Sequence, residues 1–268
     1  MKRLWILGIM AVLMSALLAP QASASTITLD GEITSITLTK GGNTIALTND
    51  STSTVEVSGT ASYTSPALSG IESYSDSSPP GTNPSINYTA GTFLTEMSGS
   101  ISGTALSTSL QGVGPYGVPT DPGNISETVI DTADYTGNVT GTPSNTSVTI
   151  PYTYTYSLTN DSGNPFYSVT YTVTLALYYD DSTLIDTYTI LNYSQENVDQ
   201  TPLANIGPLT VSGTLIDNFI LPQGILNFRA ILTATETGST VPIPASGLLL
   251  GSGLLGLGLL GWRRKKRH

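Results

Sequence analysis

Apolar residues in the central part of the chain recur at every second position, which is the period of a β-strand with one buried face. Between residues 148 and 158 the even positions are apolar and the odd ones mostly Thr or Ser; residues 169–179 place their apolar side chains at odd positions. Turn-forming residues fill 160–165, so we expect these two strands to form an antiparallel hairpin. The positions predicted to face the core are Val148, Ile150, Tyr152, Tyr154, Tyr156 and Leu158, and Val169, Tyr171, Val173, Leu175, Leu177 and Tyr179.

The same alternation predicts strands on either side of this hairpin. A turn at residues 180–182 leads into a strand at 183–193, and further turns are expected at 40–43 and 49–51. Helical periodicity over ten or more residues is absent from residues 25–236, here called the body, and the many Thr residues of the body favour strands. The other expected strands are 26–30, 32–39, 44–48, 53–63, 206–216 and 225–236, with two more near 85–97 and 100–110.

The pattern weakens between Ser65 and Pro122, where we expect long loops around the two strands near 85–97 and 100–110. A domain boundary there stays open. The preferred architecture is all-β: one antiparallel β-sandwich of jelly-roll kind over residues 25–236, followed by a short linker at 237–243.

The N-terminus has the order of a signal peptide. Lys2 and Arg3 precede an apolar run, and Ala22-Ser23-Ala24 is a small-residue cleavage pattern, so signal peptidase is expected to cut after Ala24. An uncleaved anchor is the alternative, but the apolar run is shorter than the roughly 20 residues that a stable span needs.

The C-terminus combines a proline motif, an apolar segment and a basic end. Ala245 through Trp262 is 18 residues, or about 27 Å as a helix, which is close to the thickness of a bilayer core. The cations after it would stay in the cytoplasm, which places the body outside the inner membrane. The motif is Val241, Pro242, Ile243, Pro244 and Ala245, and the basic end is Arg263, Arg264, Lys265, Lys266 and Arg267.

This tail, about residues 241–268, resembles the PEP-CTERM sorting signal of exopolysaccharide-producing Gram-negative bacteria, with Ile243 at the position of the family's glutamate. The resemblance implies that an exosortase, a membrane cysteine protease, cuts near Pro244. It also implies only transient anchoring in the inner membrane. A permanent single-pass anchor, a sortase signal and a glycolipid-anchor signal are the alternatives. The chain has no Leu-Pro-x-Thr-Gly sequence, and a glycolipid-anchor signal normally lacks a basic end.

Charge and composition narrow the function of the body. Seven of the 9 Lys and Arg residues lie in the two ends, whereas all 19 acidic residues lie between Asp30 and Glu236, so the body carries 2 − 19 = −17. A body with this negative charge is not expected to bind nucleic acid, because phosphate binding needs clustered cations. The body has no Cys, His or Trp, which excludes His- or Cys-based nucleophilic centres and the usual zinc sites. The remaining catalytic options are a pair of carboxylates, as in glycosidases, or a Ser–Lys pair that uses Lys40. Neither has a recognisable motif in the sequence, so we expect that the protein is not an enzyme.

Aromatic and acidic residues are the candidates for ligand binding. Tyr116, in a Gly/Pro loop, and the adjacent Tyr178 and Tyr179 could stack on sugars, whereas Tyr152, Tyr154 and Tyr156 are expected in the core. Asp180, Asp181 and Asp186, or Asp131 and Asp134, could offer oxygen ligands to Ca²⁺, although solvated turns fit Asp180 and Asp181 better.

The sequence thus favours a non-enzymatic surface or extracellular-matrix protein that associates with exopolysaccharide in biofilms. The alternatives are a carbohydrate-binding or Ca²⁺-dependent adhesion module and a carboxylate-based glycoside hydrolase. The expected partners are signal peptidase, exosortase and the polysaccharide.

Overall fold

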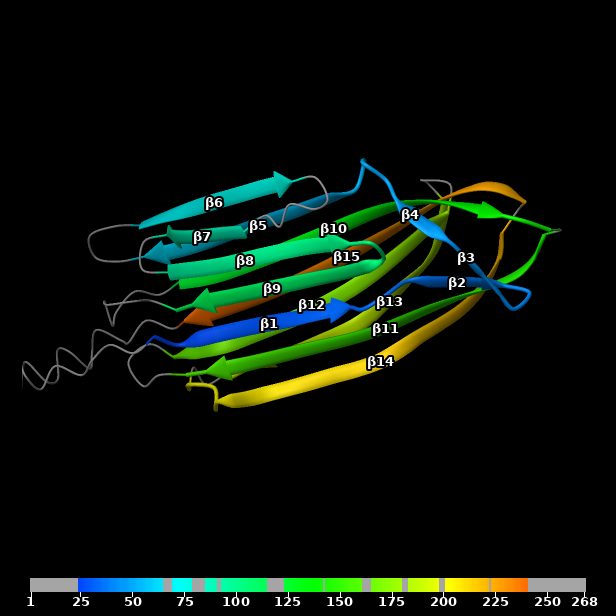
Figure 1. Cartoon of the computed structure of the whole chain (residues 1–268). Coiled ribbons are helices and arrows are strands. Elements are labelled where there is room, and N and C mark those ends of the chain that lie inside the picture. The colour runs from blue at the N-terminus through cyan, green and yellow to red at the C-terminus, as the bar shows by residue number, and fades with distance from the viewer. Residues whose placement is uncertain are drawn as a thin grey trace, which may run out of the picture.

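The computed structural model describes residues 24–64, 69–78, 85–90, 93–114, 123–141, 143–160, 165–179, 183–197, 201–221 and 223–240. This part of the chain is all-β, built from curled antiparallel sheets (Figure 1). It contains no helix long and apolar enough to cross a membrane. The predicted sorting tail and residues 1–23 of the predicted signal peptide lie outside the described residues.

The strands form two sheets, here named sheet A and sheet B. Sheet A has the order β3-β2-β11-β1-β9-β8-β7, with β14 also paired to β11; sheet B has the order β13-β12-β15-β10-β5-β6, with β4 also paired to β10. In both sheets, strands from the second half of the chain pair with strands from the first half. The bounds are β1 Thr26–Ile33, β2 Thr37–Lys40, β3 Asn43–Ile45, β4 Leu47–Asn49, β5 Thr54–Thr64, β6 Ser69–Ser78, β7 Ser85–Ala90, β8 Phe93–Ser102, β9 Ala105–Val113, β10 Gly123–Val139, β11 Ser144–Thr159, β12 Phe166–Tyr179, β13 Thr183–Glu196, β14 Ile206–Leu221 and β15 Gly224–Thr240.

The core lies between the two sheets and is built from the inward positions of alternating strands. Leu29 and Leu158 of sheet A and Val173 and Leu175 of sheet B are fully buried. The sheets approach closely where glycine replaces a side chain: a Cβ on Gly99 of β8 would lie 2.6 Å from Val55 of β5. The predicted alternation in residues 148–158 and 169–179 is confirmed by the burial pattern of β11 and β12.

The predicted hairpin between these two strands is wrong. β11 pairs with β1, β2 and β14 in sheet A, whereas β12 pairs with β13 and β15 in sheet B. Their apolar faces meet across the core, as the rings of Tyr156 and Tyr171 show with centroids 5.1 Å apart. Two strands that both bury one face satisfy the same alternation whether they pair edge to edge or pack face to face. The predicted continuation into 183–193 is confirmed, because β12 and β13 pair antiparallel.

Three further expectations need correction. The region from Ser65 to Pro122 contains β6 as well as β7, β8 and β9. β10, at residues 123–139, has no counterpart among the expected strands, although it lies between β15 and β5 in sheet B. The predicted linker at 237–243 begins too early, because β15 runs to Thr240 and pairs there with Gly123.

The turn expected at residues 40–43 is present. β2 and β3 pair with Lys40 opposite Asn43, and both intervening residues, Gly41 and Gly42, have positive φ (57° and 84°). A two-residue hairpin loop with positive φ at both positions follows the twist of the strands and strongly favours glycine.

Candidate functional site

Several residues singled out by the sequence lie outside the described part of the chain: Ala22, Tyr116, Asp180, Asp181, the sorting motif at 241–245 and the basic residues at 263–267. Ala24 lies just before β1. The roles predicted for these residues stay predictions.

The strand tyrosines are placed as expected. Tyr154 and Tyr156 are buried, and Tyr152 packs against the core. Tyr178 and Tyr179, the candidates for exposure, are both half-buried at the end of β12, and Tyr179 also packs against the core.

The acidic residues proposed as calcium ligands are separated. Asp131 is fully buried and faces the core, whereas Asp134 points to the other face of β10, and Asp186 is exposed on β13. Among the described residues, no three acidic side chains are grouped so that they could hold a metal ion.

The outer face of sheet B carries a grid of hydroxyl groups. Thr128 and Thr235 are hydrogen-bonded across β10 and β15 at 3.2 Å, and Thr170 and Ser194 across β12 and β13 at 3.1 Å. Strand geometry spaces such groups by about 4.8 Å across the sheet and about 6.7 Å along it. The two central rows contain no ionisable residue. They are Ser194, Thr170, Thr237, Ser126 and Thr60, and Asn192, Thr172, Thr235, Thr128 and Ser58.

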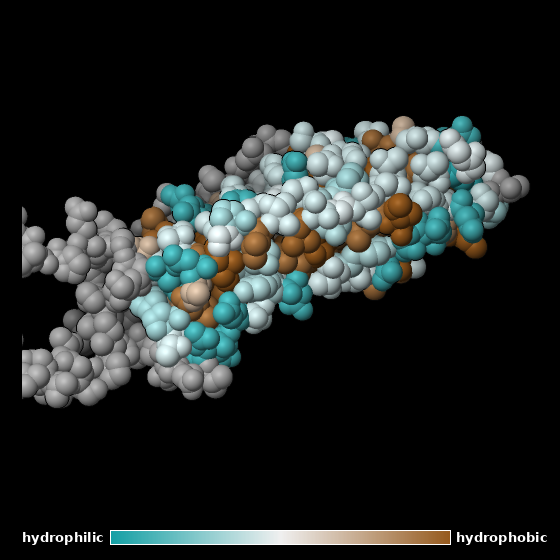
Figure 2. Space-filling view, turned by 90° about the horizontal axis from the view of Figure 1, so that it is seen from below, coloured by the Kyte–Doolittle hydropathy of each residue, from teal (hydrophilic) through white to brown (hydrophobic). Residues whose placement is uncertain are grey.

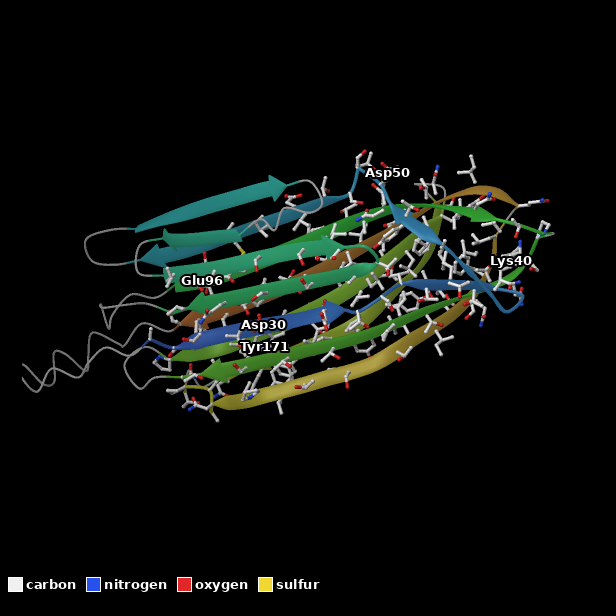
Figure 3. All side chains as sticks on the ribbon, in the orientation of Figure 1. Asp30, Lys40, Asp50, Glu96 and Tyr171 are labelled. Atoms are coloured by element: carbon white, nitrogen blue, oxygen red, sulfur yellow. The ribbon has the colours of Figure 1, made fainter. Side chains whose placement is uncertain are left out.

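The outer face of sheet A has similar hydroxyl rows but also carries acids. Asp30 accepts a hydrogen bond from Ser109, and Thr28 bonds Ser157 at 2.7 Å. Figure 3 shows Asp30 on β1 and Glu96 on β8, with Lys40 at the other end of the molecule. Three rows form this face: Ser98, Ser109, Asp30, Thr155 and Thr210; Ser100, Ser107, Glu32, Thr153 and Ser212; and Glu96, Gln111, Thr28 and Ser157.

The core contains a pair of carboxyl groups. Glu127 of β10 and Glu236 of β15 are direct cross-strand neighbours, and both are fully buried. Burial, and then the charge of its partner, raises the pKa of Glu127 well above its usual value; burial also raises the pKa of Glu236. As two carboxylates neither group could donate a hydrogen bond, but with one proton they can share one, so the fold favours the protonated pair.

A third buried carboxyl, Asp131, lies farther along β10. A Cβ on Gly99 would lie 2.6 Å from its Oδ1, and one on Gly31 would lie 2.3 Å from the ring of Tyr154, so these glycines make room for both side chains. Burial raises the pKa of Asp131 to about 8. The hydroxyls of Tyr154 and Thr108 are buried together on the facing sheet.

Both cations of the body are positioned by the fold. Arg229 of β15 forms two bonds to the carboxylate of Asp134, Nε to Oδ1 at 2.5 Å and a second to Oδ2 at 3.2 Å. The Nζ of Lys40 is within 3.5 Å of the Gly141 carbonyl. Neither cation is among the groups that perturb the pKa values of the buried carboxyls.

Comparison with known proteins identifies no relative: no family model, curated protein or solved structure matches the chain.

Together these observations place candidate binding groups on the outside. The three buried carboxyls are closed off from solvent and cannot reach a polymeric substrate. The accessible polar groups are the hydroxyl rows of the two outer faces. The two central rows of sheet B carry no ionisable residue, and the rows beside them carry Glu196 and Glu56.

Proposed function

We propose that this protein is an exported, non-enzymatic cell-surface or extracellular-matrix protein that is processed by an exosortase and associates with exopolysaccharide. The two sheets would form a β-sandwich of jelly-roll kind that presents the hydroxyl rows on its outer faces. The observation that carries the polysaccharide part is the uncharged hydroxyl grid on the outer face of sheet B.

Hydroxyl rows suit a neutral polysaccharide for a simple chemical reason. Thr and Ser can each donate and accept hydrogen bonds, as sugar hydroxyls can. Each contact is weak, but a polymer that touches many equally spaced groups gains avidity from effective concentration. Asp30, Glu32 and Glu96 interrupt the hydroxyl rows of sheet A. Covering such charges with a neutral polymer costs desolvation, so the proposed contact is on the two uncharged rows of sheet B.

The export and sorting parts of the proposal rest on the two ends of the chain. A signal peptide cut after Ala24 and a tail cut near Pro244 would leave the β body with β15 as its last strand. The intact mass of the protein from its native cells tests this step. A mass matching Ser25 to near Pro244, with or without added glycan, is expected in the medium. A mass that retains Arg263 to His268 would make the tail a permanent anchor.

The polysaccharide contact is tested by binding of the purified protein to immobilised polysaccharide from the same cells. We expect a variant carrying Thr170→Val, Thr172→Val and Thr235→Val to bind at least tenfold more weakly, because Val keeps the shape of Thr and removes the hydroxyl. The matched control carries Thr28→Val, Thr153→Val and Thr155→Val on sheet A. No binding by the wild-type protein, or equal loss in both variants, would contradict the proposal. Loss of binding on chelation would favour a calcium-dependent adhesion module instead.

A further inference from the structure

Exposed large apolar side chains in the described part of the chain lie mainly on the two edge strands β13 and β14, with one more on β15. Among residues with described side chains, all five exposed large hydrophobic ones lie on β13, β14 or the start of β15. Figure 2 shows apolar side chains in a band along the molecule, seen from below. The five are Leu184, Leu209, Ile216, Ile220 and Ile225, exposed by 52, 47, 65, 68 and 83%. Such clustering, in contrast to scattered single residues, is typical of an interaction surface.

The same two edge strands leave backbone groups available for pairing. In the described structure β14 pairs only with β11, and β13 pairs only with β12. The two edge strands lie together, because the hydroxyl of Tyr188 on β13 donates to Asp217 of β14 at 2.6 Å. An unpaired edge of this length is a template for an additional strand.

β14 has only part of the protection that prevents such pairing: it is long and has one charged residue, although it also has a proline and pairs with β11 through a register shift. Edge strands are usually protected by charged residues, prolines, bulges or short length. β14 is 16 residues long, with Pro208 near its start and Asp217 as its one ionisable residue. One carboxylate in 16 residues is a low charge density for a body of charge −17, so two copies that meet along β14 bring few like charges together, although β13 beside it carries Asp186 and Glu196.

We propose that this edge is a self-association surface, with β14 pairing antiparallel to β14 of a second copy of this chain. Antiparallel pairing of identical strands is self-complementary and closes with two-fold symmetry. Ile216 and Ile220 lie four residues apart, on the same face of the strand, so pairing would continue their apolar strip into the partner. β14 alone offers 16 residues, so a stable interface of roughly 20–30 residues per side also needs contacts from the adjoining β13.

Sedimentation of the protein purified from its native cells, over a range of concentrations and NaCl, tests the proposal. We expect a concentration-dependent dimer that salt strengthens, because salt screens the repulsion between two acidic copies. The variant Ile216→Asp, Ile220→Asp should dissociate at least tenfold more readily, whereas Thr54→Asp, an exposed change on β5 outside the hydroxyl rows, should dimerise like the wild type.

Each of these measurements has an outcome that would overturn self-association. A monomer at all concentrations, including one that binds polysaccharide through this edge, would overturn self-association. So would a dimer that the Ile216→Asp, Ile220→Asp variant leaves intact. Hydrogen exchange provides a second measure without substitution: amides of β14 should become more protected as wild-type concentration rises, and unchanged protection would also overturn the proposal.

Discussion

β10 and β14 depart in opposite ways from the rule that apolar residues lie inside and polar ones outside. β10, between β15 and β5 in sheet B, buries the carboxyls of Glu127 and Asp131 completely. β14, at the edge of sheet A, exposes Ile216 and Ile220 by about two thirds of their surface. One strand carries groups that prefer water into the core, and the other carries groups that avoid water to the surface.

The difference shows that each departure has its own physical cost. A buried carboxyl must hold a proton or a partner, so the cost in β10 depends on pH. An exposed isoleucine keeps the energetic penalty of contact with water until another surface covers it, so the cost in β14 depends on association. The two strands therefore respond to different variables, and each can be tested without the other.

The largest expected effect is the loss of stability as pH rises. The raised pKa values mean that the folded state binds more protons than the unfolded state, so stability is fully present below the ordinary carboxyl pKa and declines as pH approaches and passes about 8, the folded pKa of Asp131. The slope is about 1.4 kcal/mol per pH unit for each extra proton bound. Urea unfolding between pH 4 and 9 measures it.

Two variants identify the groups responsible for that slope. Asp131→Asn should flatten the decline, and so should Glu127→Gln combined with Glu236→Gln. Glu56→Gln, at an exposed position on β5, is the matched control and should leave the slope unchanged. A wild-type stability that does not fall between pH 5 and 8 would show that the buried carboxyls are not protonated in the fold.

A smaller but still large effect is expected from adding a side chain at Gly31, which makes room for the ring of Tyr154. A side chain at Gly31 would meet the ring of Tyr154 at 2.3 Å and the backbone oxygen of Thr153 at 2.5 Å. Gly31→Val should therefore cost about 3 kcal/mol in free energy of unfolding, at the upper end of overpacking effects. Gly207→Val on β14, where an added Cβ would meet no other residue within 4 Å except its chain neighbours, is the control. Equal urea midpoints for the two variants would contradict the close packing around Tyr154.

The sequence predicts the strands that follow the simple alternation and fails where chemistry interrupts it. β11 and β12 have nearly unbroken apolar faces and were predicted with the correct inward side chains. β10 is not predicted because its inward positions alternate apolar residues with Glu127 and Asp131. Its side chains still point alternately in and out, but apolar residues no longer occupy every second position. The pairing of β11 and β12 was wrong because local patterns do not distinguish an edge neighbour from a facing neighbour.

The candidate sites, like the strands, could be predicted only where a local sequence pattern specifies them. The hydroxyl rows could be anticipated only in part: Thr and Ser at alternate positions are visible in each strand, but their alignment across strands depends on register, which no single segment specifies. The buried pair of Glu127 and Glu236 is more than 100 residues apart in sequence. Each of the two glutamates occupies an inward position in a strand whose apolar residues alternate, and that pattern is the sequence signal that could have located Glu127 and Glu236.

The smallest effect sharpens the contrast between the two strands by making one kind of change in both. Val129→Thr on β10 buries a hydroxyl at a fully buried position and should cost about 1–3 kcal/mol. Ile216→Thr on β14 changes a side chain that is 65% exposed, so its effect on the unfolding of the monomer should stay within about 0.5 kcal/mol. Unfolding at low protein concentration keeps association out of the comparison. If Ile216→Thr costs as much as Val129→Thr under these conditions, Ile216 is already covered within a single chain, and β14 is not the open edge that the pairing of the strands indicates.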